Sequence, residues 1–409
     1  MGKIPVITGL GVVSSIGIGK EEFFKGLEES RSGLRETKFL DEPDIKSKKS
    51  FSIQGFDPSQ YLGPRGLRNL DRTTLLLLVA SKLAIEDARL EINEQNTDSI
   101  GVVTGTTLGS VWSFTEFERE ILTEGIDFAN PALFPNIVIN IPSSYISIRF
   151  NIRGFNTTIS TGFPSFFDAL RYGLDFLHMG RAEVILVGCV ESLSWQIFLG
   201  FYKLGYLAGI RGEEICCPFD RRRNGVILGE GAVVVALEDK SHALERGAGI
   251  LGEILSCTSY FDAFRLGKIH PQAEGLREAI KEAIQDSGLS LQDFDYISSC
   301  ANSTQDLDRI EYSGLRQVWG KNLKKVPVSS VKSSLGETFS ASGGFQIASC
   351  LAAINRGFVP PTLNYREKDP QIDIDCVPNK SQKKKVRHTL ISCFGPGGFN
   401  SACVLKGEC

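Results

Sequence analysis

The sequence predicts an α/β fold made of two similar halves. Short apolar runs that end in glycine or another turn residue recur along the chain, a pattern typical of strands buried on both faces. Longer segments with helical periodicity separate these runs, and strands that alternate with helices favour mostly parallel sheets. The order of elements in the first half is repeated in the second. We therefore expect a duplicated half-domain.

The apolar runs place the strands, and the helical periodicity places the main helices. Strands are expected at residues 3–9, 99–104, 184–187, 232–237, 296–299 and 388–393, and helices at residues 73–86, 164–178, 276–287 and 344–356. The second and fourth of these helices carry apolar or small residues on most faces, so we expect them to be buried between layers. The repeat divides the chain into an N-terminal half, residues 1–249, and a C-terminal half, residues 250–409.

Composition excludes several classes of protein. The 409 residues are 42% hydrophobic and 23% charged, which is ordinary for a packed protein. The 45 Lys and Arg residues are balanced by 48 Asp and Glu residues, so the charge does not suggest a nucleic-acid partner. No apolar run is long enough for membrane insertion, and no signal peptide is recognised at the N-terminus.

The cysteines and histidines do not predict a metal site. The ten cysteines include no CxxC spacing, and the four histidines are scattered. We expect no metal and no cofactor, and we interpret the chain as a reduced, cytoplasmic protein.

Four motifs resemble the β-ketoacyl-ACP synthases of the elongating, type II kind. They are Val6-Ile-Thr-Gly-Leu-Gly-Val-Val-Ser-Ser-Ile-Gly17, Pro218-Phe-Asp-Arg-Arg-Arg-Asn-Gly-Val-Ile-Leu-Gly-Glu-Gly-Ala232, Val328-Ser-Ser-Val-Lys-Ser333 and Phe394-Gly-Pro-Gly-Gly-Phe-Asn400. The resemblance extends over essentially the whole chain. It implies a thiolase-like fold, in which two βαβ-rich halves form five layers in the order αβαβα, and a dimer.

The same resemblance implies a Cys-His-His catalytic triad, but this sequence lacks all three residues. The position of the nucleophile holds Phe163, and the positions of the two histidines hold Cys300 and Glu337. The framework residues Lys332 and Gly336 are retained beside them. A benzyl group forms no thioester, and loss of a nucleophile alone removes most of the rate. We therefore expect no catalytic residue for condensation.

Each replacement has a functional and a structural interpretation. Phe163 either fills the acyl pocket of its own subunit or is a core residue of a drifted site. Cys300 is either a relocated nucleophile or, as we favour, a buried small hydrophobic residue. Glu337 either pairs with Lys332, as we favour, or acts as a lone acid or base.

The resemblance also assigns a gate and a tunnel. The gate loop reads Gly395-Pro-Gly-Gly-Phe-Asn400, which places Pro396 at the position of the gating Phe and Phe399 near the end of the loop. Proline has a fixed φ and is a poor substitute for a swinging aromatic gate. By the same resemblance, the segment around residues 105–135 lies at the dimer interface. Its side chains Leu108, Val111, Trp112 and Leu133 either line a partner subunit's tunnel or pack as ordinary interface residues.

Two arginines fall where the family presents cations to its acidic carrier protein. These are Arg65 and Arg68, and contact with an acyl carrier protein is one interpretation of them. The other interpretation is that both arginines belong to an ordinary solvated surface.

Retention of the framework without the triad resembles the chain length factor of type II polyketide synthases. That resemblance implies a catalytically inactive subunit that pairs with an active ketosynthase and shapes the polyketide or polyene tunnel. Two alternatives stay open. One is an acyltransferase or hydrolase that uses Cys300 or Glu337, and the other is a homodimeric pseudoenzyme that binds acyl chains or carrier protein.

Overall fold

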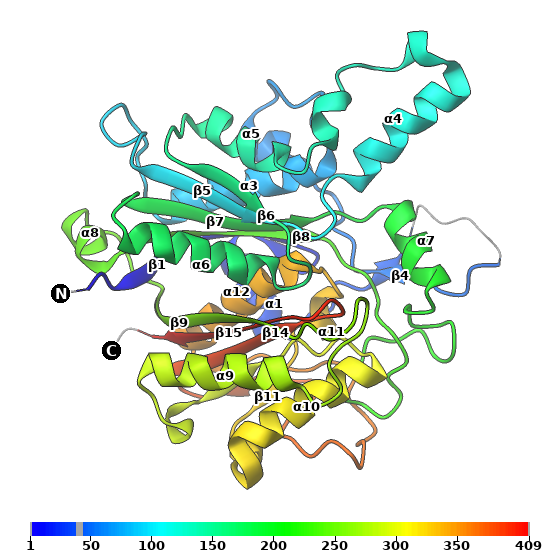
Figure 1. Ribbon diagram of the computed structural model, residues 1–409, viewed down its shortest axis with the longest axis vertical. Helices are drawn as coiled ribbons and strands as arrows, with labels where there is room; N and C mark the ends of the chain where they lie inside the picture. Colours follow the sequence, from blue (N-terminus) through cyan, green and yellow to red (C-terminus); the bar gives the residue numbers. More distant parts are fainter. Residues whose placement is uncertain (1, 38–43, 408–409) are drawn as a thin grey trace.

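The computed structural model describes residues 2–37 and 44–407. Figure 1 shows five layers: the helices α3 (Arg72–Asp87) and α5 (Ile141–Phe150), a sheet, the helices α6 (Ser165–His178) and α12 (Ser340–Arg356), a second sheet, and an outer layer with α9 (Glu274–Ser287) and α10 (Gln305–Trp319). This is the thiolase-like αβαβα arrangement, and it confirms the predicted fold.

The two halves have the same strand order. In the first half, β6-β5-β7-β8-β1 lie side by side, and in the second half β11-β10-β14-β15-β9 repeat that order. The two sheets are joined where β1 pairs with β9, so their strands form one continuous hydrogen-bonded order. The strands of the first half are β1 (Pro5–Ser14), β5 (Ile100–Gly105), β6 (Asn156–Ile159), β7 (Val184–Glu191) and β8 (Gly231–Asp239). Those of the second half are β9 (Gly252–Phe261), β10 (Tyr296–Ser298), β11 (Val328–Ser329), β14 (His388–Phe394) and β15 (Phe399–Lys406). Division into units at residues 249 and 250 stays a prediction.

The expectation of mostly parallel sheets is wrong, because each half is mixed. β5 is parallel to β6 and β7, but β8 is antiparallel to both β7 and β1. In the second half, β15 is antiparallel to both β14 and β9. β7 and β8 are connected by residues 192–230, which contain the short helix α7 (Trp195–Lys203), and β14 and β15 are connected by a tight turn. A tight turn joins only antiparallel strands.

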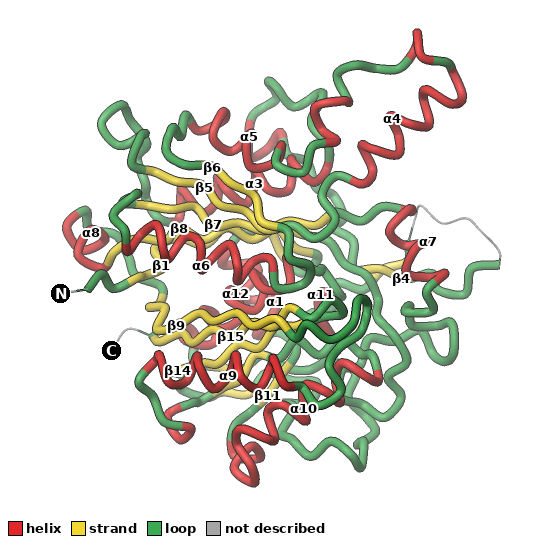
Figure 2. The backbone as a smooth tube through the Cα atoms, viewed as in Figure 1, coloured by secondary structure: helices red, strands yellow, loops and turns green. Residues whose placement is uncertain are grey.

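Further elements complete the chain, and Figure 2 shows how loops gather at one end of the sheets. The remaining helices are α1 (Lys20–Glu28), α2 (Ser59–Leu62), α4 (Val111–Glu124), α8 (Lys240–Glu245) and α11 (Lys332–Leu335), with 3-10 turns at Ile126–Phe128, Phe134–Ile137, Leu291–Asp293 and Gly320–Lys325. The remaining strands are β2 (Gly17–Ile18), β3 (Arg35–Glu36), β4 (Lys49–Ser50), β12 (Phe358–Val359) and β13 (Gln382–Lys383).

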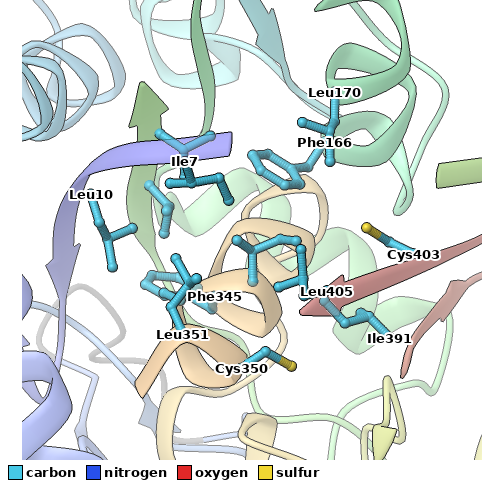
Figure 3. Close-up of a cluster of buried hydrophobic side chains, with 14 of the residues drawn as sticks. Ile7, Leu10, Phe166, Leu170, Phe345, Cys350, Leu351, Ile391, Cys403 and Leu405 are labelled. Carbon is cyan, nitrogen blue, oxygen red and sulfur yellow. The ribbon is translucent and has the colours of Figure 1, made fainter. Parts of the chain in front are cut away.

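The main core lies between the two sheets, around α6 and α12 (Figure 3). The first 14 of the 17 residues of α12 are buried, as its lack of a polar face predicts. Glycines allow this close packing. A Cβ on Gly343 would lie 2.9 Å from the Phe167 ring, and one on Gly344 would lie 2.5 Å from Cys189 Sγ. The buried pair of helices thus fixes the loops that precede α6 and α12.

The segment from α4 to the start of α5 projects from the body of the molecule (Figure 1). Its surface is unusually apolar, and we call it the α4 projection, residues 111–141. Its most exposed large apolar side chains are Trp112, Phe114, Leu122, Ile126, Phe128, Phe134, Val138 and Ile139. No helix among the described residues is long and apolar enough to cross a membrane.

Candidate functional site

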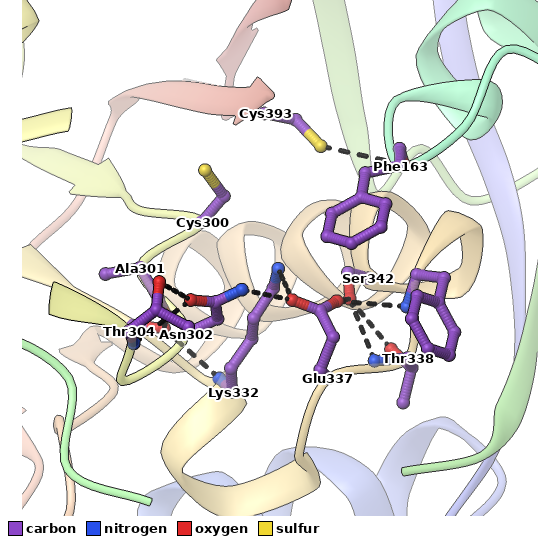
Figure 4. Close-up of polar contacts among 12 residues, drawn as sticks. Phe163, Cys300, Ala301, Asn302, Thr304, Lys332, Glu337, Thr338, Ser342 and Cys393 are labelled. Carbon is purple, nitrogen blue, oxygen red and sulfur yellow. Dashed lines mark hydrogen bonds and ion pairs between the residues drawn. The ribbon is translucent and has the colours of Figure 1, made fainter. Parts of the chain in front are cut away.

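Four loops meet at the same end of the two central helices (Figure 4). They are the turn before α6, the loop after β10, the segment between β11 and α12, and the turn between β14 and β15. The sequence places Phe163, Cys300, Glu337 and Pro396 on these four loops, one on each. The structure therefore brings the altered triad positions together.

Phe163 precedes the first turn of α6 and is half-buried. Its ring centroid lies 5.5 Å from that of Phe339, in an edge-to-face arrangement, and Lys332 Nζ lies 5.7 Å from its centre. A Cβ on Gly395 would lie 2.7 Å from the Phe163 ring, so only glycine fits at that point of the gate turn. The benzyl group is thus enclosed from the side of the gate turn and from the side of α12.

Glu337 forms the expected ion pair with Lys332. Lys332 Nζ and Glu337 Oε2 are 2.8 Å apart, and the two side chains are only 3% and 1% exposed. Oε2 also accepts a hydrogen bond from Asn302 Nδ2 at 2.8 Å. Oε1 accepts hydrogen bonds from the Phe339 amide at 3.0 Å and from Ser342 Oγ at 3.1 Å. Both oxygens are therefore occupied by donors from this chain.

Lys332 keeps its positive charge although its side chain is buried. Burial lowers the pKa of this ammonium, but the charge of Glu337 and the hydrogen bond to it raise the pKa above its ordinary value. An ammonium that is fixed in this way donates to its carboxylate partner and does not act as a base at neutral pH.

Cys300 is buried, as the structural interpretation predicts. Its amide donates to Glu311 Oε1 at 2.9 Å, and its Sγ lies 3.9 Å from the Phe394 carbonyl oxygen. Burial raises the pKa of the Cys300 thiol well above its ordinary value, with a further rise from Glu311. Burial likewise raises the pKa of the neighbouring Cys393 thiol to about 12. Neither thiol supplies the thiolate that nucleophilic attack requires.

Phe339 is a site residue that the sequence did not indicate. Its φ of 48° and ψ of −119° lie in a region that residues with a side chain rarely adopt. Its ring packs against that of Phe201, with centroids 5.1 Å apart, as well as against Phe163. The Glu337 carboxylate holds the amide of this strained residue at the start of α12.

Glu191, at the end of β7, is a second residue that the sequence did not indicate. This buried carboxylate accepts hydrogen bonds from the Thr107 amide, from Ser340 Oγ at 2.6 Å and from Thr106 Oγ1 at 3.3 Å. Its Oε2 has no hydrogen-bond partner. Burial raises the pKa of Glu191 to about 7. The side chain ties the turn before α4 to the start of α12.

The four predicted tunnel residues differ in how far they are buried. Leu108 and Val111 pack in the same apolar cluster as Phe163, and this cluster also contains Phe198, Leu207, Val226, Leu228 and Phe339. Trp112 is 43% exposed, and Leu133 is half-buried in the α4 projection. Their role in a tunnel stays a prediction.

The gate loop and the two predicted carrier contacts lie apart from each other. Pro396 is half-buried in the turn between β14 and β15 and has no amide hydrogen to offer a substrate. Phe399 packs on Phe261, with ring centroids 4.7 Å apart. Arg65 and Arg68 are exposed in the loop between α2 and α3 and do not take part in the four-loop site.

No group of three or more His, Cys, Asp or Glu side chains in residues 2–37 and 44–407 has the geometry of a metal site. The nine cysteines within these ranges are free thiols. The site therefore consists of an ion pair, an aromatic cluster and two buried thiols.

The family models for the N-terminal and C-terminal domains of β-ketoacyl synthases match residues 5–243 and 251–366. This chain belongs to the β-ketoacyl synthase family. It is 30% identical over 405 residues to 3-oxoacyl-[acyl-carrier-protein] synthase 2 of Coxiella burnetii, covering 98% of each chain. It is 32% identical to the tetracenomycin polyketide synthase ketoacyl synthase alpha subunit of Streptomyces glaucescens, covering 98% of this chain and 97% of that one.

Two solved structures of related complexes resemble the chain throughout. The ishigamide ketosynthase/chain length factor matches with a TM-score of 0.94 and 28% identity over 100% of both chains. AntDE:AntF, a type II PKS acyl-carrier protein in complex with its ketosynthase, matches with a TM-score of 0.92 and 25% identity, also over 100% of both chains. The chain is thus a ketosynthase-like protein of the kind found in type II polyketide synthases.

Proposed function

We propose that this chain is a non-catalytic subunit that pairs with an active ketosynthase and shapes the tunnel for its growing polyketide or polyene. One observation carries the proposal: Phe163, Cys300 and Glu337 stand at the positions that the resemblance assigns to a nucleophile and two imidazoles, and Glu337 is paired with Lys332. The two imidazoles stabilise developing negative charge on a thioester. A carboxylate in that place opposes the same charge.

The α4 projection supports pairing with another chain. Its apolar residues Trp112, Ile126 and Phe128 are 43%, 77% and 73% exposed, which is unfavourable for a surface that stays in water. Aromatic residues are enriched where protein interfaces form. We infer that this projection packs on the ketosynthase partner and that Leu108, Val111, Trp112 and Leu133 bound the tunnel there.

The rival enzyme activities are less consistent with the site. An acyltransferase or hydrolase that uses Cys300 needs a thiolate, whereas burial raises the pKa of this thiol. One that uses Glu337 as a base needs a free carboxylate oxygen, whereas Lys332, Asn302, Phe339 and Ser342 all donate to this carboxylate. A homodimeric pseudoenzyme that binds acyl chains or carrier protein stays the second candidate, because the α4 projection also fits a second copy.

Product length tests the proposed role in the tunnel. Trp112→Ala and Leu133→Ala, each co-expressed with the active ketosynthase and the carrier protein, are expected to enlarge the tunnel and lengthen the products measured by mass spectrometry. Leu244→Ala is the matched control, because Leu244 is 61% exposed on α8, outside the projection. Product lengths that stay the same in both tunnel variants would contradict the role.

A further inference from the structure

Two cysteines face each other across a pair of antiparallel strands. Cys257 on β9 is the register partner of Cys403 on β15. Directly opposite residues point to the same face of a sheet. Here that face lies against the core around α6 and α12, to which Cys403 belongs and on which Cys257 packs (Figure 3). No other register position among the described strands brings two cysteines together.

The two thiols are in contact with each other and with α6. A hydrogen bond joins the side chain of Cys403 to that of Cys257. Cys257 Sγ also donates to the Phe167 carbonyl oxygen at 3.6 Å. Opposite residues of antiparallel strands have Cα atoms about 4.5–5.5 Å apart, which lies within the range of about 4.4–6.8 Å that a disulfide spans. A bond between the two sulfurs therefore needs no change in the strand register.

The two cysteines differ in their access to water. Of the nine cysteines in residues 2–37 and 44–407, Cys257 alone is not buried. Cys403 is fully buried, and burial together with the neighbouring Cys257 thiol raises its pKa well above the ordinary value. A dissolved oxidant therefore reaches Cys257 first. An accessible thiol beside a second thiol that can resolve it is the arrangement of redox-sensing cysteines.

We propose that Cys257 and Cys403 form an oxidisable dithiol site that takes hydrogen peroxide and closes to a reversible disulfide. The Cys257 sulfur attacks one peroxide oxygen, the O–O bond breaks, and the products are a sulfenic acid on Cys257 and one water. The Cys403 sulfur then attacks the Cys257 sulfur. The S–S bond forms, the S–O bond breaks, and hydroxide leaves with the Cys403 proton as a second water. The two thiols lose two electrons, and the peroxide gains them.

Closure of the disulfide changes how β9 holds α6. The Cys257 thiol loses its proton in the reaction, so its hydrogen bond to the Phe167 carbonyl is lost. Phe167 lies in the first turn of α6, just after Phe163. The redox state of the pair is therefore coupled to the helix whose start carries the altered triad position. The site is contained in this chain and goes beyond its proposed pairing with a ketosynthase.

Packing alone is the simpler role for two cysteines under a helix, and two observations favour the oxidisable site over it. The first is the direct contact between the two sulfurs, which makes the second step intramolecular. The second is the exposure of Cys257, because a purely apolar contact does not need it. Cys300 and Cys393 also lie in one site (Figure 4), but both are buried, so a dissolved oxidant does not reach them in the same way.

Peptide mass mapping after treatment with hydrogen peroxide tests the proposal on the full chain and on its complex with a ketosynthase. We expect the Cys257 and Cys403 peptides to be joined with the loss of two hydrogens, and dithiothreitol to separate them. Cys257→Ser and Cys403→Ser should each abolish the link. In Cys403→Ser, dimedone should label Cys257 about tenfold more than in the parent chain, because the sulfenic acid has no thiol to condense with. Cys376→Ser, at a buried thiol elsewhere, is the matched control and should leave the link unchanged.

Three results would overturn the proposal. They are a Cys257 that proceeds to sulfinic acid without a link, a link between Cys300 and Cys393 in place of the expected one, and a Cys257 that stays reduced while a free cysteine peptide in the same tube is oxidised. Cys257→Ser carries the test if Cys403→Ser fails to fold, because Cys257 is only half-buried. Amide hydrogen exchange at residues 165–171 should be faster in the oxidised chain, and equal exchange in both redox states would contradict the coupling to α6.

Discussion

The altered triad site and the α4 projection differ in how far their apolar side chains are exposed to water. Around Phe163, aromatic rings fill the space, and the buried charges of Lys332 and Glu337 are paired. On the projection, side chains such as Leu122 and Phe128 are 84% and 73% exposed. The first region is complete within one chain, whereas the second leaves large apolar side chains in contact with water. Under the proposed function, the first region is a closed site and the second is the surface that a partner covers.

Removal of one member of the buried ion pair is expected to have the largest effect. Glu337→Ala leaves the Lys332 ammonium buried without a counter-charge and frees the amide of the strained Phe339, which together should lower the free energy of unfolding by about 3–5 kcal/mol. Urea denaturation measures the loss. The double variant Lys332→Met, Glu337→Leu should recover much of it, because apolar groups often replace a buried pair. A double variant as unstable as Glu337→Ala would contradict the interpretation.

Glu191 should make stability depend on pH. Because burial raises the pKa of this carboxyl from 4.5 to about 7, the folded state keeps a proton that the unfolded state releases between these values. The contribution of Glu191 to the free energy of unfolding is therefore most favourable below pH 4.5. It decreases as the pH rises from 4.5 to 7 and stays low above pH 7. Glu191→Gln removes this loss, so at pH 8 the variant should gain up to about 3 kcal/mol over the parent chain.

Urea denaturation at pH 5 and pH 8 measures the effect of Glu191→Gln. The exposed Glu183, at the other end of the β7 region, provides the control Glu183→Gln, which should leave the pH dependence unchanged. An identical pH dependence in Glu191→Gln and the parent chain would show that Glu191 does not titrate in this range.

A charge on the α4 projection should weaken pairing without unfolding the chain. Trp112→Asp is expected to lower affinity for the ketosynthase partner about thirtyfold, since buried aromatic residues often contribute about 2 kcal/mol to an interface. Stability of the isolated subunit should change by less than about 0.5 kcal/mol, because Trp112 is already 43% exposed. Leu244→Asp is the control. If the parent chain, Trp112→Asp and Leu244→Asp bind the ketosynthase with equal affinity, the projection lies outside the interface.

The smallest effect is expected where the projection joins the body. Asp71 caps α3, with Oδ1 accepting the Thr74 amide at 2.9 Å and Oδ2 accepting Ser113 Oγ of α4 at 3.1 Å. Asp71→Ala should lower the free energy of unfolding by about 1 kcal/mol, as loss of a helix cap does. Thermal denaturation measures it, and an unchanged melting temperature would show that the cap is dispensable.

The parts that the sequence predicted correctly are those set by local pattern. Apolar runs identified the buried strands, and the lack of a polar face identified the burial of α12. The Lys332–Glu337 pair was also predictable, because only a five-residue step through Gly336 separates them and a buried carboxylate needs a cation.

The parts that the sequence did not predict depend on distant segments. Strand direction depends on how residues 192–230 connect β7 to β8, and composition does not encode that path. Asn302 reaches Glu337 across 35 positions of the chain. The strained backbone of Phe339 has no signal in the sequence, since glycine or asparagine usually marks a positive φ.

Native mass spectrometry of this chain co-expressed with an active ketosynthase from the same source, followed by loading with an acyl carrier protein substrate, tests the central claim most directly. We predict a one-to-one heterodimer in which the acyl mass is found only on the cysteine of the partner. A homodimer that ignores the ketosynthase, or an acyl group on Cys300 of this chain, would contradict a non-catalytic partner subunit.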